Sequence, residues 1–272
     1  MTTPDISVIV PTKNSDRTLE ACLMSIASST GIAVELIVID NHSTDASAEI
    51  ARTFAETVLC SGPERSAQRN LGVRVARAEY VAIIDSDMVL EPGLLEDALS
   101  VHSADPELAG VVLPERAFGV GFWSQCRVLE KELYLNDPHV EACRVFRRDR
   151  YLEFGGYDES LVGGEDWELP DRITASGRSA GRAMRSTVWH DEGQIRLIQT
   201  FMKKRYYGVG VWSYVSSADR ELVRRRFVRP RILRKWRQLI SSPHRTVGLG
   251  VLKFFELSGL AVGMLQGRMG RS

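Results

Sequence analysis

The stretch Tyr80-Val81-Ala82-Ile83-Ile84-Asp85-Ser86-Asp87 contains the strongest structural signal of this chain. Its first five residues are mostly apolar and β-branched and predict a short buried strand that ends where the polar residues begin. Two carboxylates one residue apart after such a strand can both reach a divalent cation, directly or through water. Hard oxygen ligands suit Mg²⁺ or Mn²⁺, and such an ion would neutralise a diphosphate. Taken alone, the pattern is as typical of a solvated turn.

Two other apolar runs end in polar clusters in the same way. Ile6–Val10 is closed by Pro11, and Val34–Ile39 runs into Asp40-Asn41-His42-Ser43-Thr44-Asp45. Helical spacing fills the intervals between the predicted strands, over 15–27, up to 55, and over 68–77. Strands that alternate with helices of this length predict a mostly parallel sheet with ligands at the strands' carboxyl ends. The predicted fold class is therefore α/β, with a Rossmann-like sheet flanked by helices.

A second acidic cluster lies further along, in the glycine-rich segment 151–171. Its centre is Gly163-Gly164-Glu165-Asp166, where glycines would let the backbone approach a ligand closely and the acidic pair would begin a helix. The alternative is a loop followed by ordinary helix capping. His190 ends a predicted late strand, Val188-Trp189-His190, and is a candidate metal ligand, although a lone histidine is more often structural.

These motifs together resemble the family 2 glycosyltransferases, from the first strand to about residue 210. The residues that carry the resemblance are Ser7–Asn14, Glu35–Asp45, Arg69–Gly72 with Tyr80–Asp87, and Phe154–Asp158 through Gly163–Leu169. They occur in the family's order and at plausible spacing. The resemblance implies a GT-A domain over residues 1–217 and metal-dependent transfer of a hexosyl or N-acetylhexosaminyl group from a nucleotide-sugar to a hydroxyl acceptor.

The resemblance also implies roles for individual residues on the donor side. The expected donor-binding set is Pro11, Thr12, Asn14, Asp40, Arg65, Arg69, Asp85 and Ser86. Within it Pro11, Thr12 and Asp40 would line the base pocket. Arg65 or Arg69 would help with the base or diphosphate, or both are simply surface arginines. The expected metal ligands are Asp87, His190 and Asp85, of which Asp85 alternatively faces the ribose or a metal-bound water.

On the acceptor side, the resemblance implies an inverting reaction in which one carboxylate deprotonates the attacking hydroxyl. Asp166 would be this base, with Glu165 contacting donor or acceptor hydroxyls, and Gly163, Gly164 and Trp167 would contact sugar or acceptor. The segment also resembles the Gly-Gly-Glu-Asp/Asn stretch of animal galactosyl- and N-acetylgalactosaminyltransferases, which include retaining enzymes, so retention stays open. The expected cofactor is Mn²⁺ or Mg²⁺. The expected donor is a UDP-sugar, with GDP- and dTDP-sugars as alternatives.

The formal net charge of zero hides a strong asymmetry along the chain. Residues 219–272 carry 13 Lys/Arg against 3 Asp/Glu, a net of +10, so the first 218 residues carry −10. We expect 218–272 to be a basic amphipathic tail that attaches to an anionic membrane surface, with a lipid-linked glycan or glycolipid as acceptor. A helical hairpin packed on the core, or a dimer interface, is the alternative for its apolar part, Val247–Leu265.

Other features bound the location and the competing functions. There is no run of about 20 uninterrupted apolar residues and no secretory signal, and the four cysteines form no CxxC pair. We therefore expect no membrane span and a peripheral protein on the inner face of the cytoplasmic membrane. Nucleotidyl transfer is disfavoured because the first strand is followed by no glycine until Gly31. A nucleic-acid-binding module is disfavoured because the acidic body would repel phosphates. The oligomeric state is not predicted.

Overall fold

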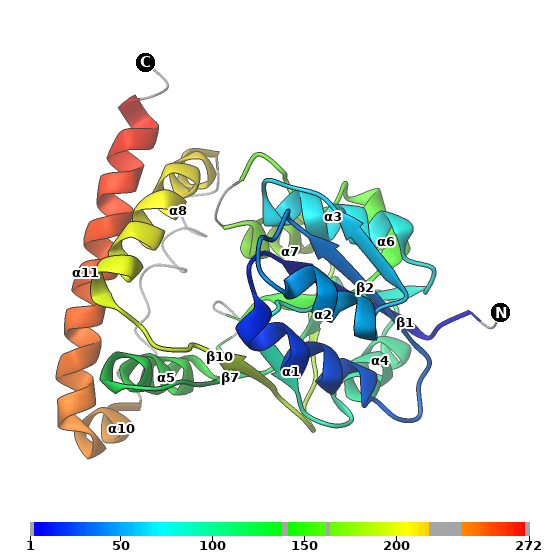
Figure 1. The fold of residues 1–272 in the computed structure, drawn as a ribbon, viewed down its shortest axis with the longest axis horizontal. Helices are drawn as coiled ribbons and strands as arrows, with labels where there is room; N and C mark the ends of the chain where they lie inside the picture. Colours follow the sequence, from blue (N-terminus) through cyan, green and yellow to red (C-terminus); the bar gives the residue numbers. More distant parts are fainter. Residues whose placement is uncertain (1–2, 138–140, 162–163, 218–234, 270–272) are drawn as a thin grey trace. The chain divides into compact units, whose positions relative to one another are not determined.

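The computed structural model describes residues 3–137, 141–161, 164–217 and 235–269. The chain forms two compact units (Figure 1). The sheet unit comprises Met1–Glu115, Ala142–Glu159 and Asp166–Asp191, and the helical unit comprises Arg116–Glu141, Ser160–Glu165 and Glu192–Ser272. This division differs from the expected boundary at residue 217, because the second unit draws on three separate parts of the chain.

The sheet unit is built on seven strands in the order β3-β2-β1-β4-β8-β6-β9. Their bounds are β1 (Ile6–Thr12), β2 (Val34–Asp40), β3 (Thr57–Cys60), β4 (Tyr80–Ile83), β6 (Gly110–Val112), β8 (Cys143–Arg147) and β9 (Ala180–Arg182). The pairs β1–β2, β1–β4, β2–β3 and β6–β9 are parallel, while β8 runs antiparallel to β4 and β6. The predicted mostly parallel sheet is therefore confirmed.

Helices cover both faces of this sheet because its strands alternate their buried side chains. Ile6, Val8 and Val10 of β1 enter one apolar core, whereas Ile9 enters the other. The first core is closed by α1 (Asp16–Ala27), α2 (Ser47–Phe54) and α4 (Leu94–Ala104). The second is closed by α3 (Arg65–Val75), α6 (Arg148–Glu153) and α7 (Glu165–Ala175), on the opposite side of the sheet (Figure 1).

Two short strands extend the sheet unit beyond the acidic motif. β5 (Met88–Leu90) follows Asp87 directly and pairs antiparallel with β10 (Val188–Asp191), with His190 opposite Met88. The predicted late strand is thus confirmed. Its pairing with β5, which was not predicted, brings His190 beside the end of the acidic motif.

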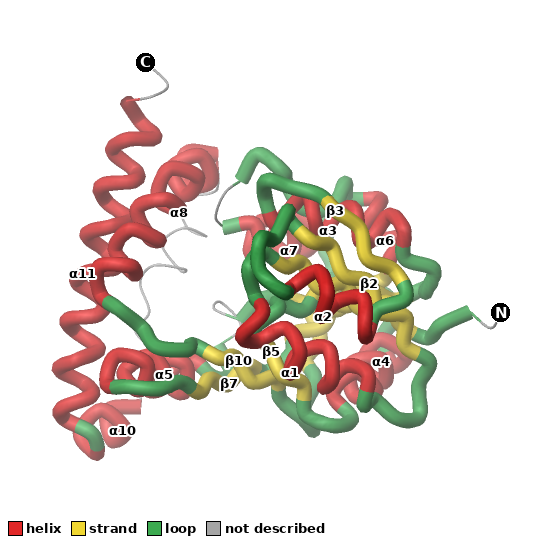
Figure 2. The backbone as a smooth tube through the Cα atoms, viewed as in Figure 1, coloured by secondary structure: helices red, strands yellow, loops and turns green. Residues whose placement is uncertain are grey.

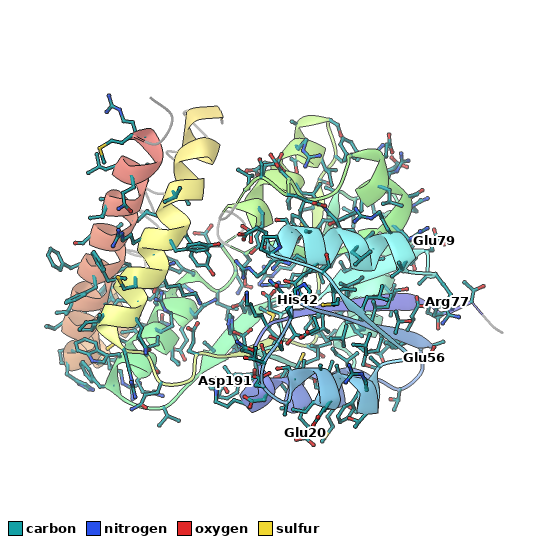
Figure 3. The ribbon with its side chains drawn as sticks, turned by 45° about the horizontal axis from the view of Figure 1, so that its top comes forward. Glu20, His42, Glu56, Arg77, Glu79 and Asp191 are labelled. Carbon is teal, nitrogen blue, oxygen red and sulfur yellow. The ribbon has the colours of Figure 1, made fainter. Side chains whose placement is uncertain are left out.

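A buried carboxylate ties the opposite end of the sheet together. Glu35 of β2 accepts hydrogen bonds from Ser7 Oγ (2.5 Å) and from Arg77 Nε (2.6 Å), and Arg77 also donates to Glu56 (3.2 Å). Figure 3 shows Arg77 and Glu56 at the end of the sheet unit away from His42 and Asp191. The charged side chains at this end pair with one another. The candidate site lies at the other end of the sheet, at the carboxyl ends of β1, β2 and β4.

The helical unit contains α5 (Phe122–Tyr134), α8 (Leu197–Ser217), α10 (Trp236–Ser241) and α11 (Pro243–Met269), and the chain enters it along β7 (Glu115–Phe118). α11 packs along α8 and against α5 (Figure 2). Among the described residues, α11 is the one helix long and apolar enough to cross a membrane by length and composition. The sequence pattern did not suggest such a helix, because Lys253 and Glu256 interrupt the apolar run. Most of the basic stretch 220–237 lies outside the described residues.

Candidate functional site

The carboxyl ends of β1 and β2 present two buried polar atoms that lack partners. Thr12 and Asp40 are neighbours in the β1–β2 register, and both side chains are buried. Asp40 accepts a hydrogen bond from Ser43 N at one oxygen (2.9 Å). Its other oxygen, Oδ1, and Thr12 Oγ1 have no hydrogen-bond partner within the part of the chain that the structure describes. Buried polar atoms of this kind are costly to leave unpaired, so these two are suited to a polar ligand.

The loops beside these atoms are held by short side chains. Asn14 has a left-handed φ of +48° and accepts a hydrogen bond from Thr44 N (2.8 Å), while its own N donates to Ser43 Oγ (2.9 Å). Ser86 Oγ donates to Ser15 Oγ (2.9 Å), which ties the acidic motif to the start of α1. Pro11 is buried within β1. Through these hydrogen bonds, Asn14 and Ser86 hold the loops at the edge of the candidate site.

Two arginines clamp Asp85, the first carboxylate of the acidic motif. Arg69 of α3 donates from Nη2 to Oδ1 (2.8 Å), and Arg144 of β8 lies with Nη1 3.2 Å from Oδ2. Burial on its own would raise the pKa of Asp85, but Arg144, Arg69 and the exposed Arg65 outweigh it and hold the pKa well below its usual range. Because both oxygens face guanidinium groups, Asp85 is a poorer candidate for a direct metal ligand than Asp87.

Arg69 also reaches the candidate base. Its Nη1 donates to Asp166 Oδ1 (2.7 Å), and its guanidinium lies 5.2 Å from the centre of the Tyr157 ring. The Arg69 side chain is fully buried, so the alternative that it is a surface arginine is wrong. The Asp166 side chain is 30% exposed at the start of α7. One buried arginine thus joins two carboxylates that are far apart in the sequence.

Asn70, next to Arg69, orders the segment that carries Tyr157. Its Oδ1 accepts hydrogen bonds from Tyr157 N (2.9 Å) and Tyr151 OH (2.6 Å), and its Nδ2 donates to Tyr157 O (2.9 Å). Gly156 has a φ of +71°, and a Cβ there would lie 2.5 Å from Asn70 Oδ1. The glycine is required for both reasons, and the ordered segment places the Tyr157 ring against Arg69.

The other end of the site joins the second carboxylate to the late strand. His190 Nε2 lies 3.1 Å from Asp87 Oδ2, and Nδ1 lies 2.8 Å from Glu115 Oε1. Burial would lower the pKa of His190, but the contacts with Asp87 and Glu115 outweigh it and raise the pKa to about 10. Glu115 in turn faces Arg144, with Nη2 3.6 Å away.

These contacts form one continuous series of alternating charges, here called the charge chain. It runs through Asp166, Arg69, Asp85, Arg144, Glu115, His190 and Asp87. The sequence analysis missed Arg144 and Glu115. The available signal was Arg144 within the segment Cys143–Phe146, whose other residues are apolar and which is buried throughout. Such an arginine requires a carboxylate partner.

Asp87 and His190 fit a divalent cation as neighbouring ligands. Ligands at right angles with bonds of about 2.1 Å have donor atoms about 3 Å apart, close to the observed 3.1 Å. Among the described residues, no three His, Cys, Asp or Glu side chains gather so that they could hold an ion on their own. A bound ion would therefore take further oxygens from a ligand or from water.

The remaining predicted residues are placed less completely. Glu165 is buried and is the first residue of α7, and Gly164 before it has a φ of +92°. Gly163 and the side chain of Trp167 lie outside the described residues.

The fold is of the GT-A type, with acidic residues at the carboxyl ends of a mostly parallel sheet. The chain belongs to glycosyl transferase family 2, whose model matches residues 7–154, more than half of its length. The succinoglycan biosynthesis protein ExoO of Rhizobium meliloti is 25% identical over 219 residues, 71% of this chain and 62% of ExoO. Three curated relatives that match over 109 to 118 residues are covered over only 32% to 37% of their own length.

Two solved structures share this fold over nearly all of the chain. The mannosyltransferase PcManGT from Pyrobaculum calidifontis, in complex with GDP-Man and Mn²⁺, has a TM-score of 0.66 and 18% identity. The alignment covers 100% of this chain and 89% of PcManGT. TarS residues 1–349 from S. aureus, in complex with UDP, has a TM-score of 0.53 and 17% identity, and the alignment covers 97% of this chain and 91% of the TarS chain. At these identities the likeness shows the fold.

Proposed function

We propose that this chain transfers a sugar from a nucleotide-sugar donor to a hydroxyl acceptor in a metal-dependent, inverting single displacement. The observation that carries the proposal is the charge chain. It joins Asp87 and His190, the proposed cation ligands, to a partly exposed carboxylate, Asp166, through buried arginines. A transferase of this kind needs both ends, because the diphosphate leaves at one and the acceptor proton leaves at the other.

The nucleotide would bind over the ends of β1 and β2. Asp40 Oδ1 would accept from a base N–H, and Thr12 Oγ1 would supply a second polar contact, since both are buried without partners among the described residues. Pro11 and Asn14 would border the base, and Arg65 would approach the diphosphate from the start of α3. We favour a UDP-sugar and keep GDP- and dTDP-sugars as alternatives, because the related folds were solved with UDP and with GDP-Man.

Asp87 and His190 would hold Mn²⁺ or Mg²⁺, as their spacing permits. When bound, the cation supplies positive charge that neutralises the diphosphate leaving group. Arg69 and Arg144 keep Asp85 ionised and hold it in place. Asp85 and Ser86 would then contact the ribose.

Asp166 would take the proton of the acceptor hydroxyl as that oxygen attacks the anomeric carbon. The bond from this carbon to the diphosphate oxygen breaks, and the nucleoside diphosphate leaves with the bonding electrons. Arg69 holds one oxygen of Asp166, while the side chain remains 30% exposed and open to an acceptor. Glu165, Gly163, Gly164 and Trp167 would border the sugar or acceptor. Retention of configuration is the second candidate, since this type of fold supports both outcomes.

The acceptor would be a lipid-linked glycan or a glycolipid, reached from the inner face of the cytoplasmic membrane. The basic and apolar composition of 219–272 supports this assignment, and we expect no nucleic-acid partner.

The test is nucleotide release from UDP-, GDP- and dTDP-sugars with Mn²⁺ or with EDTA, in the presence of membrane extract as acceptor source. One donor should be consumed in the presence of metal. Asp87→Ala and Asp166→Asn should each lower turnover by about 10² to 10⁴-fold. Glu20→Gln on the exposed side of α1 is the matched control and should change nothing (Figure 3). Silence across the panel, or turnover that EDTA leaves unchanged, would overturn the proposal.

A further inference from the structure

The longest helix of the helical unit carries its apolar residues on its outer face. Seven large apolar side chains of α11 are 38% to 70% exposed: Val247, Val251, Phe254, Leu257, Val262, Leu265 and Met269. Most of these positions are three or four residues apart, so they share one side of the helix. This set is called the apolar face. A helix whose outer side met only water would carry polar side chains on that side and apolar ones on the other.

The two charged residues near the middle of α11, Lys253 and Glu256, point toward α5 instead. Glu256 is buried and accepts a hydrogen bond from Arg127 of α5, while Lys253 pairs with Glu256 and with Glu130 of α5. Burial would raise the pKa of Glu256, but Arg127 and Lys253 outweigh it and lower the pKa to about 2. These ion pairs fix which side of α11 faces α5.

Close packing against α8 fixes the same orientation. A Cβ on Gly263 would lie 2.0 Å from Arg205 O, and one on Gly259 would lie 2.4 Å from Phe201 O. The two glycines are four residues apart, so the backbones of α8 and α11 meet along one line. Rotation of α11 to hide the apolar face would break both this contact and the ion pairs with α5.

We infer that the apolar face of α11 lies flat in the surface of an anionic lipid bilayer. This goes beyond the proposed reaction, because it concerns a surface of the helical unit and not the sugar-transfer site. Charge favours lipid as the occupant. The helices α8, α10 and α11 contain seven Lys/Arg and a single acidic residue, the buried Glu256. Lys203, Arg237 and Arg268 are exposed, and Trp236 of α10 is 53% exposed. Aromatic and basic side chains of this kind suit the headgroup region.

The two other occupants of such a face fit less well. A membrane span by α11 would draw Lys253 and Glu256, near its midpoint, into the hydrocarbon core together with Arg127 and Glu130 of α5. A second copy of the chain would bring two positively charged helical units together, with no exposed acidic residue on α8, α10 or α11 to offset them. The bilayer surface accommodates both the apolar face and the charge.

Vesicle flotation of the full chain tests this inference, with vesicles of phosphatidylcholine alone or mixed with phosphatidylglycerol. We expect binding to the anionic vesicles, and a loss of about tenfold or more in the combined variant Phe254→Ser, Leu257→Ser, Leu265→Ser. The matched control is Met24→Ser with Met184→Ser, which removes exposed apolar side chains from the sheet unit. This control should bind like the wild type.

The possible results separate the three occupants and the reaction. Binding that survives in the triple variant would overturn the inference, as would retention of the wild type in membranes washed with alkaline carbonate, which indicates a span. If the wild type and the control sediment as dimers and the triple variant as a monomer, the apolar face belongs to a second copy of the chain. That result would overturn the inference as well. Donor hydrolysis in the absence of vesicles should be equal in the wild type and the triple variant. Failure of the proposed reaction would therefore appear in both proteins, whereas failure of this inference would appear only in flotation.

Discussion

Asp85 is unusual among the acidic residues because two buried guanidinium groups share it. Arg69 and Arg144 approach its two oxygens at 2.8 and 3.2 Å, and their side chains are 0% and 9% exposed. Burying charges is costly unless every member of the group is paired. Each arginine has a second carboxylate partner, Asp166 for Arg69 and Glu115 for Arg144, so opposite charges alternate along the charge chain. The arrangement holds Asp87 and Asp166 in one network, which would fix the spacing of the proposed donor and acceptor ends.

Arg144 tests this interpretation directly. Arg144→Met leaves Asp85 and Glu115 with one guanidinium fewer, so we expect a loss of about 3–5 kcal/mol in the free energy of unfolding. We expect Arg144→Lys to fold, because it keeps the charge, but to lose at least about tenfold in kcat, because an ammonium cannot serve two carboxylates in a fixed planar geometry. Urea unfolding and donor turnover measure the two effects.

Arg147→Lys is the matched control on the same strand, since Arg147 pairs with Asp149 near the surface. It should change kcat by less than about twofold, because surface pairs contribute little. Full turnover in Arg144→Lys would show that the charge chain does not position the reacting groups.

If His190 is the proposed cation ligand, its protonation makes cation binding depend on pH. The contacts with Asp87 and Glu115 raise its pKa to about 10, so at neutral pH the imidazole carries a proton that a metal ligand must give up. Binding of Mn²⁺ should therefore release a proton. The apparent affinity should rise about tenfold for each unit of pH between about 7 and 9, below the pKa of His190. Calorimetry in buffers of different ionisation enthalpy measures the proton count.

His190→Gln should abolish the proton release and weaken binding of Mn²⁺, whereas His244→Gln, an exposed histidine on α11, should alter neither. A wild-type protein that binds Mn²⁺ with no proton release would contradict the assignment of His190 as a ligand.

Among the elements, the central strands were the most predictable from the sequence. Buried β-branched runs identify β1, β2 and β4, and the polar residues after them identify the carboxyl edge. β8 was not predicted, and Arg144 was missed with it, because an arginine in a strand normally indicates exposure. Its partners Asp85 and Glu115 come close only through the antiparallel pairing of β8 with β4 and β6. Pairing between distant strands leaves no local pattern.

The pair α8–α11 makes a prediction that compares two glycines in one helix. Gly263 meets the backbone of α8, whereas a Cβ on Gly250 would meet nothing within 4 Å. Gly263→Ala should therefore destabilise the protein by about 1–3 kcal/mol, because the helices must move apart. Gly250→Ala should stabilise it by about 0.5–1 kcal/mol, because alanine favours the helix. Chemical denaturation gives both values, and equal effects would show that α11 does not pack on α8 as described.

The division of the chain into two units bears on how it can be cut. A boundary at residue 217 was expected because the composition becomes basic there. The helical unit instead combines α5 from the middle of the chain with α8, α10 and α11. Composition reports where charge accumulates, but it does not report which helices pack together, and α5 shows no basic bias that would assign it to the tail.

Truncation after Ser217 tests this division. The cut removes α10 and α11, which leaves the Gly208 side of α8 uncovered and Arg127 of α5 without its partner Glu256. A partly buried arginine that loses one carboxylate and an apolar helix that loses its neighbour both lower stability. We therefore expect the fragment 1–217 to aggregate or to unfold at a lower temperature than the full chain, as measured by sedimentation and thermal melting. The full-length variant Glu256→Gln keeps both helices and removes only the charge, so it should melt between the two. A monomeric fragment that melts like the full chain and turns over donor at the same rate would show that 1–217 is a self-sufficient domain after all.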